Sequence, residues 1–162
     1  MLGGMRSRVH NKVRDTLMDL YREALIHPTA EPHAFPKEPN RRADLSFFLT
    51  GTQVIIDVAL THPFRDAFTM AAAAATAGAA ATQYEAVKNV EYLPLVPKGS
   101  VFVPFIVDTY GALGDKAVET LRVLVPLYAQ RLGITNTVAS RIIFNRITGS
   151  VIRGVAGIAS LG

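Results

Sequence analysis

An aspartate in the middle of an apolar segment is the first residue of this chain whose position suggests chemistry. Asp57 interrupts the segment 54–60, in which every other residue is aliphatic. A carboxylate is costly to bury there unless a cation or a hydrogen-bond donor meets it. Asp44 opens the preceding apolar segment, and a hairpin would bring the two aspartates side by side. Paired carboxylates on adjacent strands form a hard oxygen site of the kind that suits Mg²⁺.

A glutamate and a lysine farther along the chain extend this set. Glu85 and Lys88 are three residues apart in a segment expected to be helical, and Tyr92 follows four residues later, so these side chains share one helix face. A lysine close to two carboxylates can orient or activate a water molecule and offset phosphate charge. Metal-assisted hydrolysis of a phosphodiester requires this combination of groups.

Each of these residues also has an ordinary structural interpretation. Asp44 can be a turn or strand-edge aspartate, and Asp57 can be a buried aspartate paired with an arginine. Glu85 and Lys88 can be an exposed helix pair that contributes about 0.2–0.5 kcal/mol. The residues by themselves leave both interpretations open.

The pattern of apolar residues, prolines and glycines predicts the elements that must position these side chains. Adjacent strands followed by a crossover helix predict an α/β or α+β mixed fold with a small mixed sheet flanked by helices. The expected order begins with a helix over about 6–26, a loop or interrupted edge strand over 27–42, a hairpin over 43–60 that turns near Thr50-Gly51-Thr52, and a loop over 61–70. Next we expect a helix over about 79–93, a strand over 100–108 and a glycine-containing turn over 109–114. The chain would end with a helix over 115–133, which has Asp115 as its N-cap, Pro126 as a bend or interruption and Gly133 after its end, and with one or two further helices over 134–158 weakened by Gly149 and Gly154.

Composition narrows the class of protein. The 162 residues favour one domain over 1–162, with enough apolar sequence, 49%, for an ordinary core. Cysteine is absent, which excludes a disulfide framework and a thiolate zinc site and fits an intracellular compartment. We expect no membrane association, because no apolar segment has the length of a spanning helix. The net charge of +4 suits a polyanionic partner.

Four segments in order carry a resemblance to a known family. They are RRADL at 41–45, VIIDVALTHP at 54–63, YEAVKNVEY at 84–92 and VFVPFIVDTYGALG at 101–114. Together they resemble the restriction-like endonuclease domain of site-specific non-LTR retrotransposons and related nuclease regions of reverse transcriptase-like proteins, which belong to the PD-(D/E)xK superfamily. The resemblance covers about residues 8–125 and extends more weakly to the arginine-bearing C-terminal helix. It implies a restriction-endonuclease-like core over about 6–125 and a C-terminal helical extension over about 134–158.

The resemblance also implies roles for individual residues. Asp44 and Asp57 would be ligands of Mg²⁺ or Mn²⁺, Lys88 the catalytic lysine and Glu85 a supporting carboxylate. Glu31 or Glu38 would be an additional acid, and the choice between them stays open. Two positions depart from the plain superfamily pattern: Ala59 stands where a lysine is usual, which Lys88 in the following helix replaces, and Ala43 stands where a proline precedes the first acid.

Several residues are candidates for contact with nucleic acid. Arg8 and His10 match a basic-histidine start that is frequent in this family. His62 can equally form a structural hydrogen bond, Tyr110 can pack in its turn, and the arginines of the last helix can lie on a solvated face. The full candidate set is Arg8, His10, Arg42, His62, Tyr92, Tyr110, Arg141 and Arg146, with Arg153 continuing the arginine stripe.

The expected function is that of a metal-dependent DNA endonuclease associated with a mobile genetic element. Water, activated by the metal ion and by Lys88, would attack phosphorus. One such site cuts one strand, so a double-strand break needs a homodimer, a larger assembly or two visits. The alternatives are a catalytically inactive nuclease-fold subunit of a nucleoprotein assembly, with RNA or an RNA–DNA hybrid as further partners, and a structure-specific junction nuclease. In a eukaryote the compartment would be the nucleus or an organelle.

Overall fold

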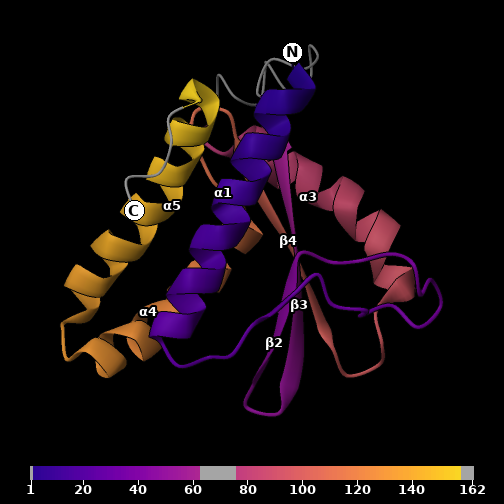
Figure 1. Ribbon diagram of the computed structural model, residues 1–162, viewed down its shortest axis with the longest axis horizontal. Coiled ribbons are helices and arrows are strands. Elements are labelled where there is room, and N and C mark those ends of the chain that lie inside the picture. Colours follow the sequence, from indigo (N-terminus) through magenta and orange to yellow (C-terminus); the bar gives the residue numbers. More distant parts are fainter. Residues whose placement is uncertain (1, 63–75, 158–162) are drawn as a thin grey trace.

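A mixed four-stranded sheet forms the centre of the computed structural model, which describes residues 2–62 and 76–157 (Figure 1). The strand order is β1-β2-β3-β4, with antiparallel pairing from β1 to β3 and parallel pairing of β3 with β4. The mixed α/β class expected from the sequence is therefore confirmed. The elements are α1 (Leu2–Glu23), β1 (Thr29–Ala30), β2 (Leu45–Leu49), β3 (Thr52–Thr61), α3 (Ala79–Tyr92), the 3-10 turn η1 (Leu93–Leu95), β4 (Val101–Asp108), α4 (Asp115–Leu132) and α5 (Asn136–Ala156).

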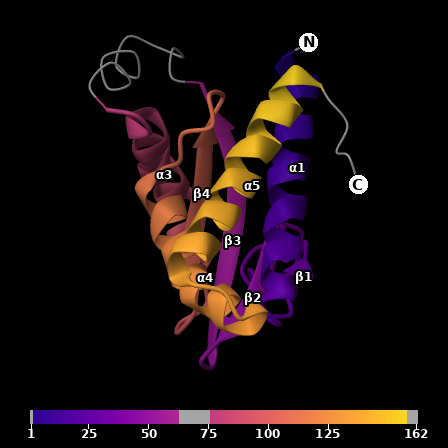
Figure 2. The same cartoon turned by 90° about the vertical axis from the view of Figure 1, so that its left-hand side faces the viewer.

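Helices cover both faces of the sheet. In Figures 1 and 2, α1, α4 and α5 lie on one side and α3 lies on the other. The larger apolar cluster fills the space under α1, α4 and α5, and includes Val58 and Phe105 from the sheet. A smaller cluster with Ile55, Phe102 and Tyr92 lies on the α3 side. Since successive strand residues face opposite ways, Asp57 shares the α3 side with Ile55.

The hairpin of β2 and β3 leaves part of β3 without an antiparallel partner. Leu45 pairs with Ile56 and Leu49 with Thr52, so β2 covers only the first half of β3. Thr50 and Gly51 make the turn with positive φ angles of 48° and 80°. Residues 57–61 extend beyond β2 while they still pair with β4. Side chains from α1 and α3 can therefore approach the same free edge.

In α4 the expected N-cap is wrong, and of the bend or interruption expected at Pro126 the interruption is wrong. The N-cap is Gly114, and Asp115 is the first helical residue without a capping hydrogen bond. Pro126 lies inside a helix that continues unbroken to Leu132. The adjacent Val125 and nearby Tyr128 are buried, so tertiary packing compensates for the backbone hydrogen bond that proline removes. Gly133 ends the helix with a positive φ of 67°, as expected.

The last segment is one helix, α5, which contains both Gly149 and Gly154. The N-terminal helix α1 lies between Leu2 and Glu23, and so begins and ends earlier than the sequence indicated. From residue 63 on, the expected loop over 61–70 lies outside the described residues. Within the described part of the chain, no helix has both the length and the apolarity needed to cross a membrane.

Gly154 marks the closest approach of α5 to α1. A Cβ atom at this position would lie 2.9 Å from both the Cα and the Cγ2 of Val9. A Cβ at Gly149 would instead lie 3.1 Å from the guanidinium of Arg153, the end of a flexible side chain. The first position requires glycine, whereas at the second a small shift of the Arg153 side chain admits a methyl group.

We expect Gly154→Ala to destabilise the protein by about 1–3 kcal/mol, because the added methyl group separates two packed backbones. Gly149→Ala is the matched control in the same helix and should be neutral or stabilising by up to about 1 kcal/mol, since alanine favours helix. Urea denaturation followed by circular dichroism measures both. Equal midpoints for the two variants would contradict the close contact.

Candidate active site

Asp44 and Asp57 lie together where β3 extends past β2. Leu45 is the first residue of β2 and pairs with Ile56. Just before it, the N–H of Asp44 donates to the carbonyl of Ile56 over 3.0 Å. The N–H of Val58 donates to Asp44 Oδ2 over 2.6 Å, so Asp44 takes the place of the missing strand. Strand register thus brings the two carboxyl groups to the same edge.

Asp57 is 7% exposed, and α3 supplies its partners. Lys88 Nζ lies 3.2 Å from Oδ2, and the Tyr92 hydroxyl donates to Oδ1 over 3.3 Å. Burial raises the pKa of the Asp57 carboxyl, and the charge of Asp44 adds to this rise, while Lys88 opposes it. The buried carboxylate is thus paired with a lysine, and not with an arginine as the structural alternative supposed.

Lys88 carries the positive charge next to this carboxylate. Burial lowers its pKa, but the charge of Asp57 and the hydrogen bonding between them outweigh burial, so the pKa of Lys88 lies above its ordinary value. Asp57 Oδ2 is buried and accepts no hydrogen bond of regular geometry from the described residues, although the ammonium is within ion-pair distance. Lys88 is therefore the cation that faces this oxygen.

His10 is the partner of Asp44 and reaches it from α1. Its Nε2 lies 2.8 Å from Asp44 Oδ1, and its Nδ1 lies 3.1 Å from Asn11 Oδ1. Hydrogen bonding to Asp44 raises the pKa of His10, since both ring nitrogens face oxygen atoms. The sequence suggested His10 as a nucleic-acid contact, whereas its observed contact is with the first aspartate.

Tyr92 forms the base of the site on the α3 side. Its ring stacks on Phe102 at 4.8 Å, and the cationic groups of Arg41 and Lys88 lie 5.1 and 5.3 Å from its centroid. Glu91 contacts both cations, at 3.2 Å from Arg41 and 4.0 Å from Lys88. The sequence analysis missed Arg41 and Glu91, although the three-residue spacing of Lys88 and Glu91 could have indicated the glutamate.

The donor set fits a magnesium ion. Asp44 and Asp57 provide adjacent carboxylates, and Asp57 Oδ2 is buried without a regular hydrogen bond. Mg²⁺ is commonly held by one or two carboxylates together with water and substrate phosphate. No group of three or more histidine and carboxylate residues suited to a metal exists within the described ranges, so the protein would supply only part of the coordination.

Glu85 does not join this site. Its carboxylate accepts the N–H of Lys116 over 2.7 Å at the beginning of α4, and burial raises its pKa. A side chain at Gly114 would collide with the same carboxylate. Glu85 thus provides the cap that Asp115 was expected to provide.

The two upstream acids lie in different places. The N–H of Glu31 donates to the carbonyl of Asp44 over 2.9 Å, but the Glu31 carboxylate points to Arg14 at 4.0 Å. Glu38 pairs with Arg41 at 3.1 Å. Of the two, Glu31 is tied directly to Asp44 through the backbone.

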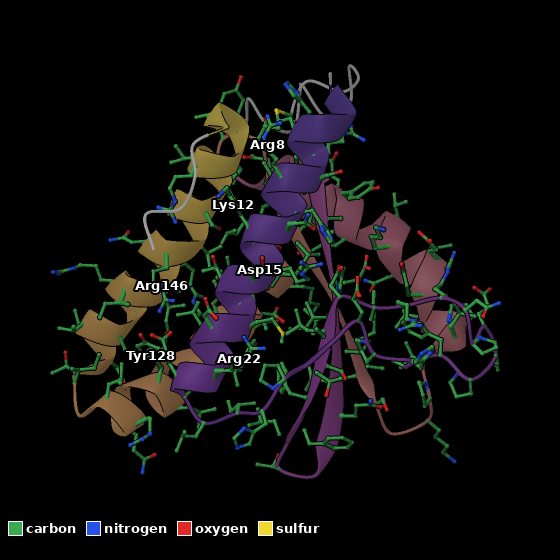
Figure 3. All side chains as sticks on the ribbon, viewed as in Figure 1. Arg8, Lys12, Asp15, Arg22, Tyr128 and Arg146 are labelled. Atoms are coloured by element: carbon green, nitrogen blue, oxygen red, sulfur yellow. The ribbon has the colours of Figure 1, made fainter. Side chains whose placement is uncertain are left out.

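The remaining nucleic-acid candidates are distributed over several elements. Arg8 lies where α1 meets α5 and donates to the carbonyl of Gly154 over 3.4 Å (Figure 3). Arg146 points toward α1 and donates to Glu23 and to the Tyr128 hydroxyl (Figure 3). Arg42 donates to the carbonyl of Glu31. The rings of His62 and Tyr110 lie 6.3 Å apart, and Arg141 is exposed. The arginine stripe of α5 is therefore interrupted by a structural ion pair.

No protein-family model matches the chain, and no curated protein matches it in sequence.

We expect Glu85→Ala to destabilise the protein by about 1–2 kcal/mol, because the first turn of α4 loses its capping acceptor. Glu85→Gln keeps an acceptor oxygen and should cost less than half as much. Urea denaturation gives both values. Equal stability of the parent and the alanine variant would contradict the capping role. If Glu85→Gln is as stable as the parent but has lost DNA cleavage, Glu85 takes part in catalysis.

Proposed function

We propose that this protein is a metal-dependent endonuclease that hydrolyses phosphodiester bonds in DNA. The observation that carries the proposal is the pair of adjacent carboxylates, Asp44 and Asp57, at the open edge of β3 with Lys88 bound to the second. Metal-assisted phosphodiester hydrolysis requires such a combination of groups. Here it would consist of the buried Asp57, the neighbouring Asp44 and the Lys88 ammonium, 3.2 Å from Asp57.

The order of elements supports the resemblance to the restriction-like endonuclease domain of non-LTR retrotransposons. The first aspartate directly precedes β2, and the second lies in the apolar strand β3. Lys88 and Tyr92 follow in α3, and β4 leads into a turn at Tyr110-Gly111. This is the sequence of elements in which that family carries its acids, lysine, tyrosine and glycine. Association with a mobile genetic element belongs to the same proposal.

Asp44 and Asp57 would hold Mg²⁺ or Mn²⁺. The ion would polarise the scissile phosphate and lower the pKa of an attacking water molecule. Asp44 is fixed for this task because one oxygen accepts a backbone N–H and the other contacts His10. Asp57 is fixed by Tyr92 and Lys88.

Lys88 is suited to stabilise charge on the phosphate. Its ammonium group stays protonated beside Asp57 and is half-buried, so it acts in surroundings where charge is less screened than in water. Its contact with Glu91 limits the directions in which the side chain can move. Lys88 therefore offers a positioned positive charge rather than a proton acceptor.

DNA is the proposed substrate because the net charge of +4 favours a polyanion. One copy of the site cuts one strand, so cleavage of both strands would use a homodimer or successive binding events. We assign the activity to an intracellular compartment, the nucleus or an organelle in a eukaryote.

We expect Asp57→Asn to reduce nicking of supercoiled plasmid by at least about 100-fold, the scale on which loss of one charge-stabilising group slows an enzyme. DNA binding should stay equal or become tighter, because a negative charge near the phosphate is removed. Asp19→Asn, at an exposed position of α1, is the matched control. The assay compares Mg²⁺, Mn²⁺ and EDTA.

Cleavage by Asp57→Asn at the parental rate would eliminate Asp57 as a ligand. A parent protein that cuts no duplex, single-stranded or branched DNA with either metal would favour the inactive nuclease-fold alternative.

We expect Lys88→Ala to lose about 100- to 1,000-fold in nicking rate, because the positive charge at the phosphate disappears. Lys116→Ala is the control, since it removes an exposed lysine that pairs with Glu119 along α4. Adding Ala59→Lys to Lys88→Ala should restore part of the activity, because residue 59 shares a face of β3 with Asp57. The recovery should be small, since a displacement of about 1 Å can cost about 100-fold in rate. Parental nicking by Lys88→Ala would exclude the lysine from catalysis.

A further inference from the structure

A polar hollow opens beside the candidate site, on the side of the sheet that α1 covers. Its volume is about 370 Å³, and its lining comes from two elements. The residues that line it are Arg6, Ser7, His10 and Asn11 of α1 and Leu60 of β3.

Its place in the fold links this hollow to the two aspartates. His10 contributes to the lining and contacts Asp44 at 2.8 Å. Leu60 belongs to the part of β3 that extends beyond β2, three residues after Asp57. Figures 1 and 2 show the N-terminal half of α1 next to the C-terminal end of β3. A ligand in the hollow would therefore lie next to His10 and Asp44, across the free edge of β3 from Asp57.

The charge of the hollow comes from Arg6. This residue is exposed and has no ion-pair or hydrogen-bond partner within 2–62 and 76–157. The other arginines of α1 are engaged: Arg14 pairs with Asp15, Arg22 with Asp19, and Arg8 donates to a carbonyl of α5. Arg6 is thus the guanidinium at this hollow that makes no polar contact within the described residues.

Asn11 adds a neutral donor to the same wall. Its Oδ1 lies 3.1 Å from His10 Nδ1, which directs the amide NH₂ group away from His10. A guanidinium and an amide NH₂ on one side of a hollow suit an oxyanion, and Arg binds phosphate in particular through paired N–H groups.

We propose that this hollow binds a backbone phosphate of the DNA strand that the neighbouring carboxylates cut; the inference rests on the proposed function. Leu60 lies about 10 Å from Asp57 along β3, at about 3.3 Å per residue. A separation on this scale makes the contacted phosphate a close neighbour of the scissile phosphate on the same strand. The strand would then pass along α1 and reach Asp44 and Asp57 from that side.

The test removes the guanidinium of Arg6 and compares the result with removal of Arg22, which pairs with Asp19 on the same helix. Arg6→Ala and Arg22→Ala make the same change in net charge, and both are placed in the Asp57→Asn background so that DNA stays uncut. Fluorescence anisotropy of a labelled duplex is measured across a range of salt concentrations. Each lost phosphate contact should reduce the slope of log affinity against log salt by about 0.9. We expect that reduction for Arg6→Ala and an unchanged slope for Arg22→Ala.

Steady-state nicking in the otherwise unchanged protein gives the second readout. Arg6→Ala should raise KM and leave kcat unchanged, because a contact remote from the reacting atoms binds substrate and transition state equally. Equal salt slopes for Arg6→Ala and Arg22→Ala would overturn the inference, whatever the activity. If the parent does not nick DNA but only Arg6→Ala reduces the slope, the phosphate site stands and the proposed catalytic function falls.

Discussion

The ion pair between Asp57 and Lys88 is the interaction on which the arrangement of the candidate site depends. A carboxylate in the middle of β3 faces the α3 side of the sheet and is almost fully buried. Without a cation it would be forced toward its neutral form, because burial penalises the charge. Lys88 meets this requirement only if α3 crosses the sheet in one orientation. The same orientation brings the Tyr92 ring onto Phe102 and its hydroxyl group to Asp57.

Because β2 is shorter than β3, the Asp44 carboxylate can lie at the same sheet edge as the Asp57 carboxylate. Because β2 begins at Leu45, Asp44 occupies the position that a longer strand would fill, and one of its oxygens accepts the N–H of Val58. α1 covers one face of the sheet and α3 the other, so Asp44 meets a histidine from one side and Asp57 meets a lysine from the other. The site therefore exists at an interruption of regular pairing, where β-strand ends commonly leave room for function.

Local patterns were sufficient to predict the hairpin, the helix over α3, the strand β4 and the glycine that ends α4. They also brought Asp44 and Asp57 together, because strand register follows from the hairpin. Contacts between distant segments could not be predicted in this way. Glu85 and Lys88 share a helix face in sequence, yet their offset of three positions shifts Glu85 by about 4.5 Å along the axis, enough for it to meet α4 instead of β3.

The same limit applies to His10 and Pro126. The pairing of His10 with Asp44 depends on how α1 lies across the sheet, which no spacing within α1 encodes. A proline inside a helix is usually a breaking signal, but the buried residues around Pro126 outweigh that preference. Tertiary packing decided these positions, and single-segment reasoning does not include it.

The contact of Gly154 with Val9 has a consequence for the extent of the functional unit. Val9 directly precedes His10, so α5 fixes the height and rotation of the part of α1 that carries the partner of Asp44. The apolar surface shared by these helices includes Val9, Val13, Ile143 and Val151, all fully buried. The four segments that suggested a nuclease end at residue 114, before α5 begins at Asn136. The smallest fragment able to hold His10 in place therefore has to contain a helix that lies outside those four segments.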